Sequence, residues 1–240
     1  MNKQQLAAKI WESANKMRSK IEANEYKDYI LGFIFYKFLS EKEEKFLFDK
    51  KYDKESIKTV TEESSETVEY VQDSIGYFIS YENLFQTWIE KGKDFDISDV
   101  SDALNAFGRL IKPSQRDVFD GIFNTLQTGL TKLGDSAASR TKAVRDLIHL
   151  IKEIPMDGKQ DYDVLGFIYE YLISMFAANA GKKAGEFYTP HEVSLLMSEI
   201  VANHLEDNGK DKIEIYDATS GSGSLLINIG KSVARYVEDN

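Results

Sequence analysis

The chain has 240 residues, 42% hydrophobic and 12% aromatic, which is enough to bury the core of one large or two modest globular domains. It has no cysteine, which excludes disulfides and thiolate metal sites and suits the reducing cytoplasm. A formal net charge of -10 argues against a large phosphate-binding surface on this chain alone, because non-specific DNA affinity comes from clustered lysine and arginine.

Two further classes of protein are not indicated. The N-terminus lacks the apolar run of a signal peptide, and no segment approaches the roughly 18 apolar residues of a membrane-spanning helix. Neither export nor membrane insertion is expected. His149, His191 and His204 are scattered, without the spacing of metal ligands, so no metal site is expected.

The first two-thirds of the chain are predicted to be almost entirely helical, because apolar residues recur at three- and four-residue intervals. One stripe runs from Leu6 to Ile21, and a second helix from Tyr29 to Phe46. The charged segment 50–72 indicates a solvated helix or a mobile connection, and residues 77–80 a short extended piece. Helical spacing returns over four segments: residues 84–89, 100–111, 118–126 and 143–154.

Pro155 and the residues Met156-Asp157-Gly158 interrupt the helical pattern and predict a domain boundary. We expect an N-terminal helical domain over 1–155 and a second domain over 156–240. A helix from about Asp163 to Ala178 should open the second domain. Thr189-Pro190-His191-Glu192 then has the form of a helix start, with Thr189 as N-cap, Pro190 first in the helix and Glu192 completing a capping box; this helix should run to about Leu205.

The pattern of the last 30 residues is that of an α/β unit. Residues 212–217 predict a short strand, followed by a loop rich in glycine and serine and a helix over about 224–237. Strand, glycine loop and helix in this order place backbone N–H groups where α/β folds bind nucleotide-like ligands. Gly221 and Gly223 would permit positive φ and close ligand approach. A tight turn without a ligand is the alternative.

Two other nucleotide-binding motifs fit this loop poorly. A P-loop is rejected, because Leu225 stands where a glycine is needed and Gly230-Lys231-Ser232 falls inside the predicted helix. A dinucleotide fingerprint would need a third glycine at the position of Leu226 and a second strand that the sequence does not supply.

The residues from Asp217 to Ser224 resemble the first cofactor motif of DNA adenine methyltransferases, in the version found in the modification (M) subunits of type I restriction-modification systems. Gly185 to Pro190 resembles the loop that precedes this motif in the same family and closes over the cofactor. The two pieces, about 30 residues apart, are far more specific together than alone. Residues 163–177 and 10–40 resemble the helix before that loop and the N-terminal helical domain of these subunits.

The resemblance implies a mainly α chain, in which a helical bundle precedes the start of a Rossmann-like methyltransferase domain that uses S-adenosylmethionine. The implied activity is methyl transfer to N6 of adenine in a specific DNA site, after base flipping. The implied partners are DNA, reached through the complex, a specificity subunit, a second methyltransferase subunit and a restriction subunit. The residues expected to bind the cofactor are Glu186, Phe187, Tyr188, Thr189, Pro190, Asp217, Thr219, Ser220, Gly221 and Gly223.

Two departures limit what this chain is expected to do. Ala218 follows Asp217 where the family often has proline, a small change. The base-contacting Asn-Pro-Pro-aromatic motif of the family does not occur, so no catalytic residue is assigned, and methylation by the chain alone is not expected. A strand at residues 213–216 would also need neighbours that the sequence does not show. A non-catalytic assembly module and another Rossmann-like enzyme, using NAD or methylating a small molecule, are the alternatives.

Overall fold

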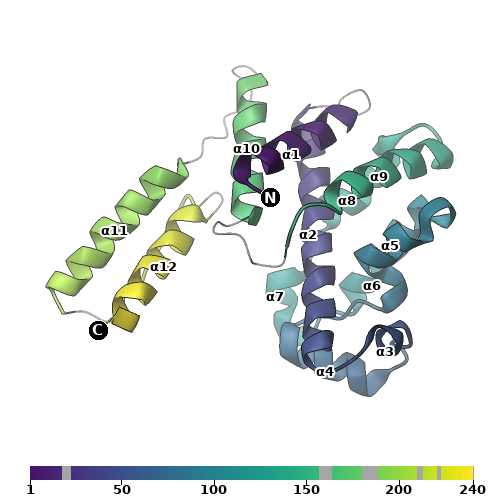
Figure 1. Cartoon of the computed structure of the whole chain (residues 1–240), viewed down its shortest axis with the longest axis horizontal. Helices are drawn as coiled ribbons and strands as arrows, with labels where there is room; N and C mark the ends of the chain where they lie inside the picture. Colours follow the sequence, from purple (N-terminus) through teal and green to yellow (C-terminus); the bar gives the residue numbers. More distant parts are fainter. Residues whose placement is uncertain (18–22, 157–163, 180–188, 210–212, 221–222, 240) are drawn as a thin grey trace. The chain divides into compact units, whose positions relative to one another are not determined.

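The structure, a computed structural model, describes residues 1–17, 23–156, 164–179, 189–209, 213–220 and 223–239. Every regular element within these ranges is a helix (Figure 1). The chain forms two compact units, Met1–Ile168 and Tyr169–Asn240. The predicted helical character is therefore confirmed, whereas the α/β character of the second domain is not seen in the described residues.

The first unit is built around one long helix, α2 (Ala23–Asp49), which packs against helices before and after it in the chain (Figure 1). The remaining α-helices of this unit are α1 (Lys3–Met17), α3 (Lys54–Lys58), α4 (Ser65–Ile75), α5 (Phe85–Lys91), α6 (Ile97–Arg109), α7 (Arg116–Phe119), α8 (Asn124–Gly129) and α9 (Ala137–Ile151). Four short 3-10 turns, η1 (Tyr81–Asn83), η2 (Gly92–Asp94), η3 (Pro113–Gln115) and η4 (Leu130–Leu133), link them.

The apolar stripes predicted for the first two helices form the core of this unit. Leu6, Ile10 and Ala14 of α1 are fully buried, as is Phe33 of α2; Ile21, the end of the first stripe, lies outside the described residues. An aromatic cluster from helices distant in sequence adds to this core. Its members are Tyr36, stacked on Trp88 at 4.7 Å between ring centroids, with Tyr77, Phe107, Phe119 and Phe123 around them.

Three segments of the first unit differ in detail from the prediction. The helix expected over 118–126 is divided into α7 and α8, because Gly121 adopts φ 76° in the turn between them. The segment 50–72 holds a helical turn and the start of α4. The short extended piece at 77–80 is reduced to one antiparallel bridge between Tyr77 and Ile111.

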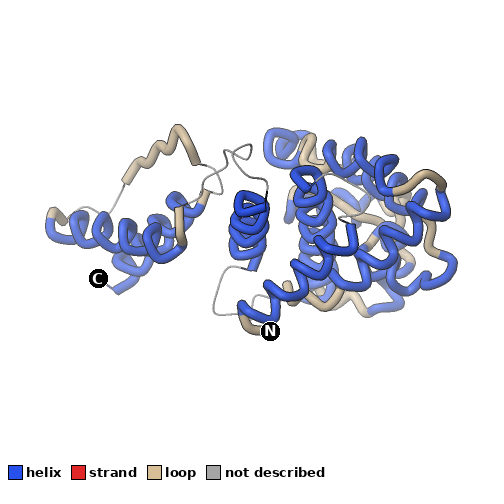
Figure 2. Tube along the Cα trace, turned by 90° about the horizontal axis from the view of Figure 1, so that it is seen from above, coloured by secondary structure: helices blue, strands red, loops and turns tan. Residues whose placement is uncertain are grey.

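The second unit contains most of α10 (Val164–Asn179), together with α11 (His191–Asp207) and α12 (Ser224–Asp239). The strand predicted over 212–217 is wrong for the described residues 213–217, which are loop (Figure 2). The physical reason is that a strand forms only when a neighbour satisfies its backbone groups, and none of the described residues provides one.

Candidate functional site

Helices α11 and α12 lie side by side and run in the same direction (Figure 1). Near their N-terminal ends, Asn228 Nδ2 donates to Ser194 Oγ at 2.9 Å. Further along both helices, Ser232 Oγ donates to Glu199 Oε1 at 2.8 Å. Because residue numbers increase together along the contact, the pair is parallel, and residues 213–220 return from the end of α11 to the start of α12 (Figure 2).

The parallel arrangement brings parts of the two sequence motifs together. Pro190 stands directly before α11, and Gly223 directly before α12. Both helices therefore begin at the same end of the pair. The sequence had placed Thr189 and Pro190 in one motif and the residues from Asp217 to Gly223 in the other. Glu186, Phe187, Tyr188 and Gly221 lie outside the described residues.

The start of α11 differs from the predicted capping box. Pro190 itself is the N-cap, with φ -53° and ψ 142°, and its carbonyl accepts from the N–H groups of Val193 and Ser194 at 3.0 Å. Glu192 is then the second helical residue and not the third, so it cannot close a capping box with Thr189. Thr189 is half-buried and Pro190 exposed.

The loop before α12 is organised by Asp217. Its Oδ1 accepts from the backbone N–H of Thr219 at 2.9 Å and from the Thr219 hydroxyl at 3.3 Å, which makes an Asx turn. Its Oδ2 is buried and has no hydrogen-bond partner among the described residues. Thr219 and Ser220 are exposed. This leaves one carboxylate oxygen with unused acceptor capacity at the head of the helix pair.

Gly223 closes this loop and opens the helix. Its N–H donates to the Ser220 carbonyl at 2.7 Å, and its own carbonyl accepts from the N–H of Ile227 at 2.9 Å. Gly223 has φ 72°, as expected from its position, and this conformation disfavours any β-branched residue. Among the described residues, a Cβ built on Gly223 would meet only Ile227, at 4.0 Å, so the space next to Gly223 is open.

This end of the helix pair has the chemistry to bind a small polar ligand. The unpartnered oxygen of Asp217 can accept a hydrogen bond from a hydroxyl or ammonium group. The first-turn N–H groups of α11 and α12 carry partial positive charge, which suits a carboxylate. These features suit a ligand that carries a hydroxyl or ammonium group together with a carboxylate.

Sequence reasoning missed the polar residues that join the two helices. The structure buries four polar side chains in segments that the sequence predicted only as helices: Ser194, Ser198, Asn228 and Ser232. One feature of the sequence could have indicated this polar contact: Ser194 and Ser198 are four residues apart and therefore lie on one face of the helix.

In the described ranges, no group of three or more histidine or acidic side chains is arranged to hold a metal ion. The helices that the structure describes include none that is long and apolar enough to cross a membrane.

Comparison with known protein families gives two matches that together span most of the chain. Residues 6–151 match the family described as HsdM N-terminal domain, and residues 160–240 match the family described as N-6 DNA Methylase. The first covers most of the first unit, and the second includes α10, α11, α12 and both sequence motifs.

Similar individual proteins carry related names. The type I restriction enzyme MpnII methylase subunit of Mycoplasma pneumoniae is 32% identical over 95% of this chain and 44% of its own length. The MjaVIII methylase subunit of Methanocaldococcus jannaschii is 27% identical over 95% of this chain and 35% of its own length. A crystal structure of the type I restriction-modification system methyltransferase subunit from Streptococcus thermophilus superposes with a TM-score of 0.76 at 31% identity, covering 97% of this chain and 50% of that one. The chain thus spans half or less of the length of these relatives.

Proposed function

Because the chain belongs to the HsdM family, whose members are the methylase subunits of type I restriction enzymes, we propose that it is the N-terminal part of such a subunit. The whole protein transfers a methyl group from S-adenosylmethionine to N6 of adenine in a specific DNA site. Residues 160–240 supply part of its cofactor site.

The observation that carries this proposal is the parallel pairing of α11 and α12. It brings Thr189 and Pro190, which precede α11, and Gly223, which precedes α12, to one end of the pair. They belong to the two segments that resemble cofactor motifs of type I modification subunits. The two motifs are about 30 residues apart in sequence, so only the packing of α11 against α12 can bring them close together. Their common location supports a shared ligand.

Individual residues have distinct roles in this proposal. Asp217 accepts a hydrogen bond from the ligand through the oxygen that is not engaged by Thr219. Gly223 allows the loop to turn into α12 and keeps the space above it open. Glu186, Phe187, Tyr188, Thr189 and Pro190 line the other side, with Ser220 and Gly221 on the glycine loop. S-adenosylmethionine, when bound, supplies the methyl group on a positively charged sulfur.

The DNA is reached through partners. The net charge of -10 is unsuited to phosphate binding, so basic surface and sequence choice come from a specificity subunit. A second methyltransferase subunit and a restriction subunit complete the assembly, which acts in the cytoplasm. By itself the 240-residue chain does not methylate DNA, because it has no Asn-Pro-Pro-aromatic segment to hold a flipped adenine.

A calorimetric titration tests this proposal. S-adenosylmethionine and NAD are titrated separately into the chain, with S-adenosylhomocysteine as a competitor. Heat is expected with S-adenosylmethionine and not with NAD. Heat with NAD alone would identify a different Rossmann-like enzyme, and tight binding to specificity subunits without cofactor heat would identify an assembly module.

A further inference from the structure

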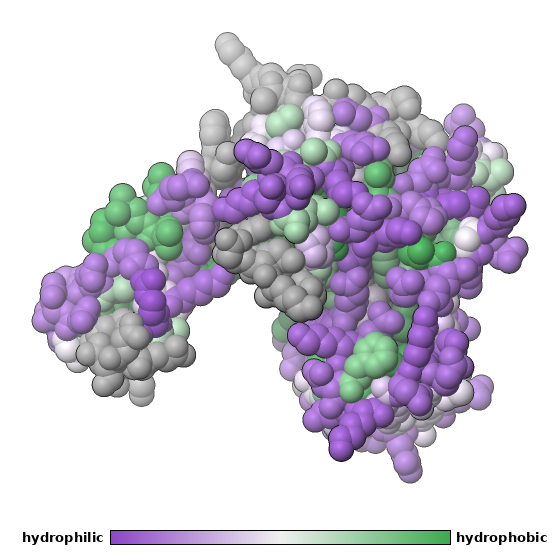
Figure 3. Space-filling model, in the orientation of Figure 1, coloured by the Kyte–Doolittle hydropathy of each residue, from purple (hydrophilic) through white to green (hydrophobic). Residues whose placement is uncertain are grey.

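One carboxyl group of the first unit lies where a charge is costly. The side chain of Glu43 in α2 is 0% exposed, and among the residues that the structure describes no cationic side chain forms an ion pair with it. Its Oε1 atom also has no hydrogen-bond partner there. The surface of the first unit, by contrast, is mainly hydrophilic (Figure 3). An ionised carboxylate is strongly disfavoured in such surroundings, so Glu43 is expected to hold a proton.

The other oxygen of Glu43 binds the backbone of an irregular segment, residues 77–80. Glu43 Oε2 accepts from the N–H of Ile79 at 2.9 Å. The hydroxyl of Tyr77 donates to the Leu39 carbonyl of α2 at 2.9 Å. Apart from the isolated bridge that begins at Tyr77, residues 77–80 have no regular structure. Side chains, and not a helical or sheet pattern, therefore connect this segment to α2.

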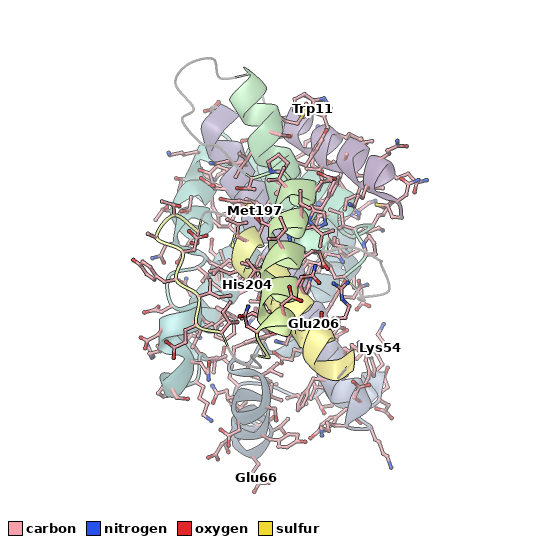
Figure 4. All side chains as sticks on the ribbon, turned by 90° about the vertical axis from the view of Figure 1, so that its left-hand side faces the viewer. Trp11, Lys54, Glu66, Met197, His204 and Glu206 are labelled. Carbon is pink, nitrogen blue, oxygen red and sulfur yellow. The ribbon has the colours of Figure 1, made fainter. Side chains whose placement is uncertain are left out.

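Among the described residues, no cation is placed to compensate a charge on Glu43. The titratable groups that face its carboxyl are acidic: Glu44 and Tyr36 of α2, and Tyr77. The lysines nearest to it on α2 and on the helices α3 and α5, which pack against α2, are bound elsewhere: Lys37 to Glu41, Lys54 (labelled in Figure 4) to Glu90, Lys58 to Glu55 and Lys91 to Asp99. Burial accordingly raises the pKa of Glu43 well above its ordinary value.

We propose that Glu43 is a proton-dependent latch that holds residues 77–80 on α2. With the proton bound, the neutral carboxyl stays buried and accepts from Ile79. When the proton is released to solvent as pH rises, the carboxylate has to reach water, which requires residues 77–80 to move away from α2. This contact then opens locally, while helices distant from it remain folded. The latch is independent of the proposed function.

The pH dependence of the opening has a definite sign and size. The carboxyl is neutral in the closed contact and ionised in the open one, so opening releases one proton. Each unit of pH above the ordinary pKa of about 4.3 and below the closed-state pKa should therefore favour opening by about tenfold. At lower pH both forms are protonated, and the contact should stay closed.

Amide hydrogen exchange of the 240-residue chain, measured at several pH values and low urea concentrations, tests this proposal. The Ile79 amide should open more readily than the amides of the buried residues Val144 and Leu147 in α9. Its opening should depend little on urea, because a local opening exposes little surface. After correction for the intrinsic exchange rate, its protection should fall by up to about tenfold per pH unit.

Two matched variants isolate Glu43. Glu43→Gln keeps an acceptor for Ile79 but cannot ionise, so the protection of Ile79 should become independent of pH. Glu66→Gln makes the same change at an exposed position of α4 that points away from the first unit (Figure 4), and it should retain the original pH dependence. Carbon-13 NMR of the Glu43 carboxyl in the original chain gives a readout that does not require the variant to fold.

Four results would overturn the latch. They are an Ile79 amide that exchanges only with global unfolding, protection of Ile79 that does not change with pH, the same pH dependence in Glu43→Gln as in the original chain, and a Glu43 carboxyl that titrates near its ordinary pKa of about 4.3.

Discussion

The backbone N–H of Thr219 donates to one carboxylate oxygen of Asp217 at 2.9 Å, while the second oxygen is buried without a partner among the described residues. Asp217 thus stabilises the turn of the loop with one oxygen and has a second oxygen that can accept a hydrogen bond from a ligand. Asp217→Ala should lower the affinity for S-adenosylmethionine by about tenfold or more, because a charge-assisted hydrogen bond and the Asx turn are both lost. Titration calorimetry measures the change. Asp207→Ala, at the other end of α11, is the control and should leave the affinity unaltered.

Gly223 offers a test that depends on backbone conformation. At φ 72°, valine is strained by about 1–3 kcal/mol, so Gly223→Val should reshape the loop and abolish cofactor binding. Gly230→Val in the middle of α12 is the matched control, since a Cβ there meets nothing within 4 Å. If both variants bind S-adenosylmethionine equally well, the glycine loop is not part of the site.

The polar contact between α11 and α12 can be dissected with a double-mutant cycle. Asn228→Ala should destabilise the second unit by about 1–2 kcal/mol, because it leaves the buried Ser194 hydroxyl unsatisfied. Ser194→Ala combined with Asn228→Ala should cost less than the sum of the two single changes, because the hydrogen bond is lost only once. Urea unfolding followed by circular dichroism gives the free energies, and additive effects of the single changes would mean that the bond contributes nothing.

Close packing in the first unit requires a glycine at position 129. A Cβ on Gly129 would lie 2.0 Å from Cε1 of the buried Tyr29, so Gly129→Ala should destabilise the unit by about 1–3 kcal/mol. Gly108→Ala in α6 meets nothing within 4 Å and should be neutral or stabilising by up to about 1 kcal/mol. Thermal unfolding of the two variants distinguishes a steric cost from a general effect of losing glycine.

Burial raises the pKa of the Glu43 carboxyl well above its ordinary value, and the nearby charge of Glu44 raises it further. The backbone N–H of Ile79 donates to Glu43 Oε2 at 2.9 Å and acts in the opposite direction, lowering the pKa. The folded state therefore holds a proton that the unfolded chain releases above a pKa of about 4.3. The contribution of Glu43 to stability is complete below that pKa and decreases as pH rises towards the folded-state pKa.

Glu43→Gln removes this titration and keeps an acceptor for Ile79. The variant should gain stability relative to the original chain as pH increases from about 4 to 8. Denaturant unfolding at several pH values measures the difference. A difference that stays constant over this range would show that Glu43 is ionised in the folded protein.

The helices could be predicted from sequence because their determinants are local. Leu6, Ile10 and Ala14 are spaced for one helical face, and that face is buried. The strand predicted over 212–217 is wrong for residues 213–217, because strand formation depends on hydrogen-bonding neighbours that a local pattern does not show. The helix expected over 118–126 is divided because Gly121 adopts a positive φ, and the spacing of apolar residues does not indicate the conformation of a single glycine.

Only some features of the candidate site could be predicted from the sequence. The residue types from Asp217 to Gly223 indicated a ligand loop, and the positive φ of Gly223 is confirmed. The capping box at Thr189 was wrong by one residue, because Pro190 remains outside the helix. The parallel pairing depends on Ser194 and Asn228, which are 34 residues apart, and nothing in their local sequence indicates that they meet.

The most direct test of the central claim is photo-crosslinking of radiolabelled S-adenosylmethionine to the 240-residue chain, followed by peptide mapping. We predict label on the peptides that contain residues 186–190 and 217–223, with loss of both signals on addition of excess S-adenosylhomocysteine. Label confined to the first unit, or label that S-adenosylhomocysteine does not displace, would contradict a cofactor site at the head of the α11–α12 pair.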